Sequence, residues 1–269
     1  MVKAAEGFKP VNAIMHADIS VTKPVGESSS APYVGTFNGN GHTLNVNIDG
    51  GNDRHVAPFC FVGKENNMVY FQDLHVTGSV KGGNYTGGLI GEIDCIARLE
   101  RVWVSVEVTT TEDYLGGIVG DLNSKNSIAD MINCRFDGSL KTTQLSKNNV
   151  DAGAFLCTYS KPYTTNMFRN GYENGTYEAF GNLGINCVTR EEIYNDGTNV
   201  VSAHSWGEVD SDKRNITDQN KVVEFMNNAM AGSWEIKDGK AVPVMVTESA
   251  DGSPVPESDF KEQLVNEWQ

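Results

Sequence analysis

A five-residue glycine-rich phrase occurs twice in this chain of 269 residues. Residues 87–91 have the sequence Gly-Gly-Leu-Ile-Gly, and residues 116–120 have the sequence Gly-Gly-Ile-Val-Gly. Weaker copies occupy residues 59–63 and 152–156. Internal repetition at a period of about 30 residues is typical of solenoids, because each repeat buries its apolar face only by stacking on the next. This repeat therefore constrains the fold more than any other feature of the sequence.

A segment with apolar residues at every second position accompanies the glycine phrases. This alternation is the period of a β-strand with one buried face, whereas a helix would show a period of about 3.6 residues. Alignment of the segments predicts equivalent anchor positions at Leu44, Leu74, Val102, Cys134 and Gly171. In such a stack Val104 would point inward between Val76 and Phe136, within one continuous apolar core.

Two classes of solenoid fit part of this pattern. The spacing from Phe71 to Leu74 and Val76 matches the start of a leucine-rich repeat. However, Ser79 stands where that repeat has Asn or Cys, and no helical stretch follows each alternating segment. The glycine-rich phrase suits a further strand instead. The sequence therefore favours an all-β fold, a parallel β-helix.

A solenoid exposes apolar surface at both ends, so each end needs a cap. The sequence predicts four regions: an N-terminal cap and lead-in (residues 6–36), the β-helix coils (37–217), a C-terminal cap (218–246) and an acidic tail or linker (247–269). The C-terminal cap is predicted as one short helix that begins after Asp218, followed by a hairpin. The Asp238-Gly239 pair is a strong signal for the turn of that hairpin.

Composition and charge exclude several classes of function. The net charge of −14 disfavours a nucleic-acid partner, which needs a basic surface. No apolar run approaches the ~20 residues that a membrane-spanning helix needs. The five cysteines are odd in number and show no Cys-x-x-Cys spacing, so we expect buried thiols rather than disulfides or a metal site. No signal peptide is visible at Met1, which is compatible with a signal that has been removed.

Residues 33–44, with the sequence Tyr-Val-Gly-Thr-Phe-Asn-Gly-Asn-Gly-His-Thr-Leu, precede the repeated Gly-Gly-Leu-Ile-Gly units. Together these motifs resemble the GLUG-motif proteins, which are secreted or surface-anchored proteins of bacteria. The similarity covers about residues 10–246, and the closing residues 234–245 also look like the end of such domains. The resemblance implies a right-handed β-helix outside the cytoplasm. It does not imply one activity, because the repeats occur in adhesin-like proteins and beside enzyme domains.

This sequence departs from that family in two places. The first and fourth glycine phrases are eroded, and residues 178–217 contain no clear repeat.

Stacked coils also predict which outward side chains share a row. His75, Trp103 and Arg135 fall in one such row. A Trp between His and Arg suits a sugar ring, because the aromatic face packs on C–H groups while the cations donate to hydroxyls. An ordinary solvent-exposed face is the competing interpretation. We take His75, Trp103 and Arg135 as the predicted ligand-binding residues.

Candidates for catalysis and for metal binding are weaker. Glycoside hydrolysis needs two carboxyl groups a defined distance apart, and the candidates Glu107 and Asp137 fall in different rows. His42 lies in a turn, where a local hydrogen bond is expected, and His16, His55 and His204 have no recognisable partners. Residues 49–53 lack the spacing of a calcium loop. We therefore predict no catalytic residue, no metal site and no cofactor.

Two functions follow from these patterns. The first is a non-catalytic extracellular module of a bacterial surface or secreted protein, which acts in adhesion, in glycan or protein binding, or as a stalk. The second is a carbohydrate-active enzyme, a lyase or hydrolase that works along one face. A flat face of Thr, Ser, Asn and aromatic side chains favours the first, and a cleft with convergent acids favours the second. The expected partner is a glycan or a host or cell-surface protein, and the chain is expected to be a monomer.

Overall fold

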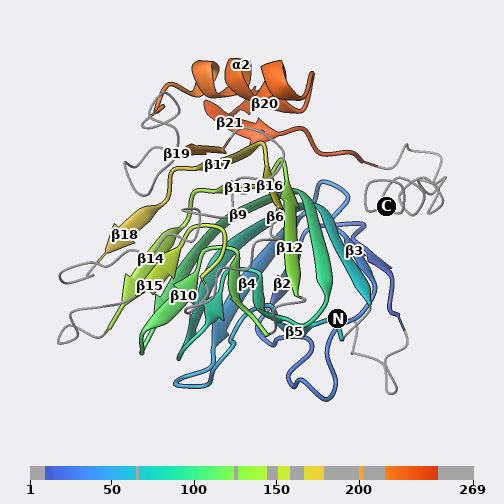
Figure 1. Cartoon of the computed structure of the whole chain (residues 1–269), viewed down its shortest axis with the longest axis vertical. Coiled ribbons are helices and arrows are strands. Elements are labelled where there is room, and N and C mark those ends of the chain that lie inside the picture. Colours follow the sequence, from blue (N-terminus) through green and yellow to red (C-terminus); the bar gives the residue numbers. More distant parts are fainter. Residues whose placement is uncertain are drawn as a thin grey trace.

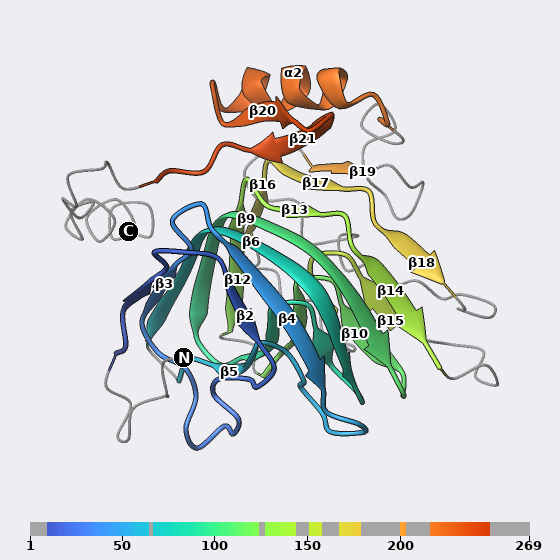
Figure 2. The same cartoon turned by 180° about the vertical axis from the view of Figure 1, so that it is seen from behind.

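The computed structural model describes residues 10–64, 67–123, 127–143, 151–157, 167–178, 200–202 and 216–247. Over these ranges the chain winds into a parallel β-solenoid, as predicted, with a short helix and a hairpin near its C-terminus (Figure 1). The first coils lie at one end of the stack, and the C-terminal helix and hairpin lie beyond the strands of the later coils (Figure 2).

One large parallel sheet forms the main wall of the solenoid. Its central path runs through β1 (Ala13–Ile14), β3 (Thr36–Asn38), β6 (Met68–Gly82), β9 (Ile96–Thr110), β13 (Arg135–Phe136), β17 (Gly171–Glu173) and β19 (Val200–Ser202). The strands that pair beside this path are β2 (Ile19–Val21), β4 (Thr43–Asp49), β12 (Ile128–Ile132), β14 (Ser139–Thr142), β16 (Met167–Arg169) and β18 (Thr176–Glu178).

Two smaller parallel sheets complete the central coils. One contains β7 (Thr86–Gly87), β10 (Tyr114–Gly116) and β15 (Asp151–Gly153), and the other contains β5 (Phe59–Val62), β8 (Ile90–Ile93) and β11 (Val119–Leu122). The glycine phrases form the corner between these sheets. A Cβ on Gly88 would overlap the Gly117 carbonyl oxygen, and a Cβ on Gly117 would overlap that of Ala154. The phrase recurs because neighbouring coils approach too closely at this corner for any side chain.

The register of the central coils agrees with the sequence alignment. Leu74 pairs with Val102, and Arg135 pairs with Trp103 on one side and with Tyr172 on the other. Residues that follow equivalent anchors therefore lie beside one another in successive coils.

Three of the predicted alignments between repeats were wrong. Leu44 pairs with Val76 rather than with Leu74, because four residues separate β3 from β4 where the next coil has only two. The shift of two keeps every side chain on its predicted face. Phe59 pairs with Ile90, so the first glycine phrase is offset by three residues. Gly153 pairs with Gly116, so the fourth is offset by one.

The long strands bend at one corner, where a residue in each coil takes the left-handed backbone conformation. Asp73, Arg101, Asn133 and Asn170 take φ values of 52°, 54°, 52° and 59° in successive coils. Asn and Asp tolerate this conformation better than most residues. The Arg101 guanidinium donates to both carboxylate oxygens of Asp73, at 2.6 and 3.0 Å, and Asn170 Nδ2 donates to Asn133 Oδ1 at 2.8 Å. Polar side chains therefore tie this corner together between coils.

The C-terminal elements match the predicted helix and hairpin. Helix α2 (Gln219–Ala229) begins after Asp218, whose carboxylate accepts from the Asn220 amide at 3.0 Å. Strands β20 (Trp234–Lys237) and β21 (Lys240–Pro243) pair antiparallel about the turn at residues 238–239. A second apolar cluster joins these elements to the coils and contains Tyr172, Val222, Met226, Trp234 and Ala241.

Several predictions concern cysteines and membrane segments. Cys60, Cys95 and Cys134 are free thiols and are buried, Cys157 is also buried, and Cys187 lies outside the described residues. The described part of the chain holds no helix that is both long and apolar enough to span a membrane.

Some predicted regions lie outside the described ranges. They are the tail after residue 247, most of residues 178–217, His204 and the start of the N-terminal cap.

The inward row of the main sheet gives the first prediction. Val104 is fully buried and pairs with Val76 and Phe136. Val104→Asp places an unpaired charge in this core, so we expect the free energy of unfolding to fall by several kcal/mol, about 3–5. Chemical denaturation measures the change. Asn47→Asp, which adds the same charge at an exposed outward position of β4, is the control and should change stability little. Equal stability of the two variants would contradict the inward assignment.

Candidate functional site

The structure places the three predicted ligand-binding residues in one row. His75 and Trp103 stack with ring centroids 3.9 Å apart and an interplanar angle of 13°. The Arg135 guanidinium lies 5.4 Å from the Trp103 ring centroid, and the Tyr172 ring lies 5.2 Å away on its other side. The row is therefore a continuous stack of aromatic and cationic groups across four coils, longer than the sequence predicted.

The C-terminal segment covers much of this row. Arg135 has an exposed fraction of 0% and donates to the carbonyl oxygen of Ala241, with Gln219 Oε1 at 3.4 Å. The Lys240 ammonium lies 5.5 Å from the Trp103 ring centroid. Two of the three predicted ligand-binding residues, Trp103 and Arg135, thus contact the protein's own C-terminal segment in this structure.

Asp137 is the polar centre of this contact. Its carboxylate accepts from Trp103 Nε1 at 2.6 Å, from Arg135 Nη2 at 3.0 Å and from Lys240 Nζ at 2.8 Å. Burial opposes the ionised form, but the Arg135 charge and these donors hold the pKa of Asp137 below its usual value. Asp137 is therefore ionised and joins β9, β13 and β21.

Asp137 gives the second prediction. Asp137→Ala leaves the buried Arg135 without its carboxylate partner and releases Lys240. We expect a loss of about 3–5 kcal/mol in the free energy of unfolding, because breaking one side of a buried ion pair leaves an uncompensated charge. The exposed Asp53→Ala change is the control and should stay within about 0.5 kcal/mol of wild type. Comparable denaturation midpoints for both variants would show that the C-terminal segment does not depend on this carboxylate.

Burial also controls the protonation of His75. It lowers the pKa of His75 from 6.5 to about 4. The Asp137 charge opposes this shift, whereas the charges of Lys240, Lys237 and Arg135 add to it. Between about pH 4 and 6.5 the unfolded chain therefore binds a proton at this position that the folded chain does not bind. The stability that the neutral His75 imidazole contributes is fully present above pH 6.5 and is lost as the pH falls toward 4.

His75→Gln is the third prediction, because it removes this titration. The difference in unfolding free energy, variant minus wild type, should be more positive at pH 4 than at pH 7 by about 1–3 kcal/mol. Denaturation at both pH values measures it, with the exposed His16→Gln change as the control. A difference for His75→Gln that does not vary with pH would contradict the buried, neutral imidazole.

The outward side chains beside this row form a flat polar face. We define the polar face as Asn45, Asn47, Thr77, Ser79, Ser105, Glu107 and Ser139, from β4, β6, β9 and β14. Long hydrogen bonds run between coils: Thr77 Oγ1 donates to Asn45 Oδ1 at 3.5 Å, and Ser79 Oγ donates to Asn47 Oδ1 at 3.2 Å. The face therefore presents ordered hydroxyl and amide groups on successive coils.

The other sequence candidates lie apart from one another. Glu107 pairs in register with Ser139 and accepts from Lys141 Nζ at 2.7 Å, so it forms no carboxylate pair with Asp137. His42 Nδ1 lies 3.3 Å from Asp18 Oδ1, which is 24 residues away in the sequence, so this contact runs between coils rather than within the turn as predicted. Asp49 accepts from the Gly51 amide at 2.9 Å, as in an ordinary turn.

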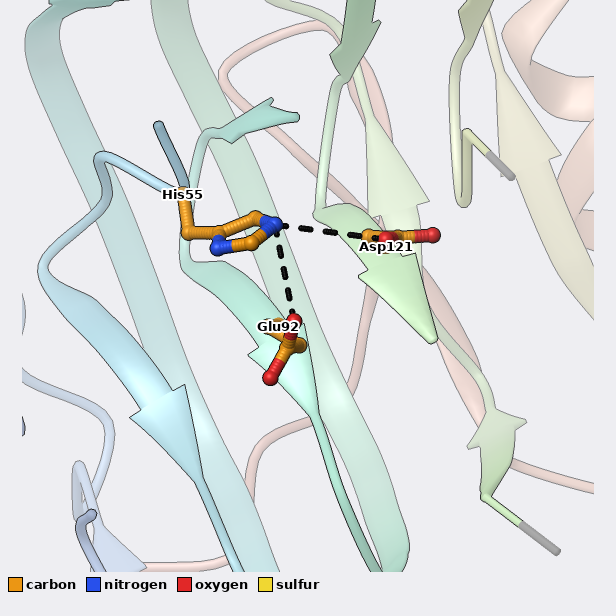
Figure 3. A group of neighbouring side chains, drawn as sticks. All are labelled: His55, Glu92 and Asp121. Carbon is orange, nitrogen blue, oxygen red and sulfur yellow. Dashed lines mark ion pairs between the residues drawn. The ribbon is translucent and has the colours of Figure 1, made fainter. Parts of the chain in front are cut away.

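A second constellation was missed by the sequence analysis. His55 Nε2 lies 3.5 Å from a carboxylate oxygen of Glu92 and 4.0 Å from one of Asp121 (Figure 3). The three side chains are largely buried, with exposed fractions of 13%, 11% and 18%. Glu92 and Asp121 are register partners on the adjacent parallel strands β8 and β11, so their like charges lie side by side.

Burial and mutual repulsion shift the protonation of this cluster. Burial first, and then the charges of Asp121 and Asp94, raise the pKa of Glu92 from 4.5 to about 7. Burial raises the pKa of Asp121 from 3.8 to about 6. Burial, with the nearby charge of Arg54, lowers the pKa of His55 from 6.5 to about 4. All three groups are therefore less readily charged than in water.

The glycine phrases position this cluster. The two intact phrases each end in a glycine followed directly by an acid, Gly91 before Glu92 and Gly120 before Asp121. A Cβ on Gly91 would overlap the carbonyl oxygen of His55, so the glycine lets the His55 backbone approach the strand. The repeated glycine–acid step was the sequence signal that could have found the two carboxylates. Nothing in the sequence pointed to His55, which reaches them from a turn.

Comparison with family models, with curated proteins and with solved structures finds no match to this chain. The class that the structure itself defines is a parallel β-solenoid protein.

Proposed function

We propose that this protein is a non-catalytic extracellular module of a bacterial surface or secreted protein, and that it acts in adhesion by binding glycans. The resemblance of residues 33–44 and of the glycine phrases to the GLUG-motif proteins motivates the extracellular and bacterial parts of this proposal. Binding to a host or cell-surface protein and service as a stalk are the other forms that such a module takes.

The polar face is the observation that carries the proposal. Its hydroxyl and amide groups repeat from coil to coil on a rigid sheet, with the neighbouring strands of a sheet spaced about 4.8 Å apart. A glycan presents hydroxyl groups along an extended chain, so a flat array of short donors and acceptors complements it. Trp103 and His75 border this array and are partly exposed, so one edge can also offer aromatic contact.

A carbohydrate-active enzyme is the second candidate, and one observation favours it. Glu92 and Asp121 carry oxygen atoms within 4.8 Å of each other, near the separation of about 5 Å that retaining glycosidases use. However, His55 lies against both carboxylates, so the space between them is occupied by a side chain rather than open to a sugar ring. Release of reducing ends from a polysaccharide, with loss of that activity in Glu92→Gln, would favour the enzyme.

The fourth prediction tests glycan binding at the polar face. The double change Asn47→Arg with Ser79→Arg places two bulky side chains on the face and should weaken binding to a glycan identified on an array by at least about tenfold. Such a loss corresponds to about 1.4 kcal/mol of binding free energy. Surface plasmon resonance with that glycan measures the affinity.

Ser29→Arg is the matched control, because Ser29 is exposed in the loop before β3. It should leave affinity unchanged. Glycan binding that is equally strong in the double variant would move the site off the polar face. Failure of the wild-type protein to bind any glycan on the array would contradict the proposed function.

A further inference from the structure

We infer that His55, Glu92 and Asp121 form a Zn²⁺ site that ties three successive coils together. His55 lies in the turn between β4 and β5, Glu92 lies on β8, and Asp121 lies on β11 (Figure 3). Each residue thus comes from a different coil. This inference is independent of the proposed glycan binding, because the cluster does not belong to the polar face.

The spacing of the ligand atoms suits one small cation. Tetrahedral zinc with bonds of about 2.1 Å holds its ligand atoms about 3.4 Å apart. The two separations from His55 Nε2 are 3.5 and 4.0 Å, and all three ligand atoms lie within 4.8 Å of one another. The two separations from His55 thus exceed the tetrahedral value by about 0.1 and 0.6 Å, and the two carboxylate oxygens would approach each other by up to about 1.4 Å to complete the shell.

The donor set points to zinc rather than to calcium or magnesium. One imidazole nitrogen with two carboxylate oxygens is a set that zinc binds, whereas calcium and magnesium prefer shells made of oxygen alone. Three protein ligands leave one tetrahedral position for water or for an oxygen of a bound molecule. The partial exposure of Asp121 gives that position access to solvent.

Within the described residues no Lys or Arg forms an ion pair with the Glu92 carboxylate, and the charges of Arg54 and Lys64 act on it from beyond ion-pair distance. Glu92 is nine-tenths buried, and one of its carboxylate oxygens faces His55 (Figure 3). His55 is its one ion-pair partner in the described ranges, at 3.5 Å, and the next acid along the sheet lies beside it. A buried carboxylate with a like charge as its neighbour is costly unless a cation joins them. A divalent ion would neutralise both carboxylates together.

The surrounding residues hold the imidazole in place. The His55 ring stacks on Tyr85, with centroids 5.2 Å apart at 28°, and meets the Phe61 ring edge-on at the same distance. The His55 amide donates to the Asn84 carbonyl at 3.0 Å, and the residue takes a left-handed φ of 58°. The ligand is thus positioned before any ion binds, which lowers the ordering cost of binding.

A zinc titration tests the inference. The chain, freed of metal with a chelator, is titrated with ZnCl₂ in a calorimeter. The wild type should bind one equivalent at this site, and Glu92→Gln and His55→Gln should each weaken it by at least about tenfold. Zinc should also raise the melting temperature of the wild type alone, since an ion that binds the folded state stabilises it. Glu92→Gln removes a buried charge without removing volume, so it is expected to fold.

His16→Gln is the control, since His16 is exposed at the N-terminal end and should leave zinc affinity unchanged. Circular dichroism verifies the fold of each variant. X-ray absorption at the zinc edge should show one nitrogen and two or more oxygens. No zinc binding, or binding that both cluster variants retain, would overturn the inference. An equal rise in melting temperature with CaCl₂ would overturn the assignment of zinc.

Discussion

The burial of apolar side chains between coils is the interaction on which the rest of this structure depends. A single coil carries Val, Ile, Leu and Phe on one side of each strand and has nothing of its own to pack them against. Stacking places Val76, Val104 and Phe136 in one inward row, each fully buried. Because strand side chains alternate, the same register sends every second residue outward. The polar face and the Trp103 row are therefore consequences of the core.

The glycine phrases set how closely the coils can stack. At the corners, carbonyl oxygens occupy the space that a Cβ would need at Gly88 and Gly117. The acids that follow the two intact phrases occupy paired positions in successive coils, which is why Glu92 and Asp121 are neighbours. The glycines that allow close packing are thus followed by acids at paired positions, and His55 lies against these two acids.

The sequence predicted the parallel solenoid, the inward position of Val104, the row of His75, Trp103 and Arg135, and the C-terminal helix and hairpin. These features depend on local alternation and on turn signals. The offset of Leu44 was missed because a corner insertion changes the register without changing the alternation. The contact of Arg135 with Ala241 and the ion pair of Asp137 with Lys240 could not be predicted, since they join segments separated by about a hundred residues and no periodic signal marks them. The position of His55 beside Glu92 and Asp121 could not be predicted either, because no periodic signal marks that turn residue.

Hydrogen exchange measured by NMR on β9 tests the central claim most directly, which is that each coil is paired on both sides. β9 lies between β6 on one side and β12, β13 and β14 on the other. In a parallel sheet, alternate amides of a central strand donate to opposite neighbours. The account predicts contiguous slow exchange from Val102 to Val108. Fast exchange at every second amide would mean that β9 is an edge strand, and it would contradict the stacked solenoid.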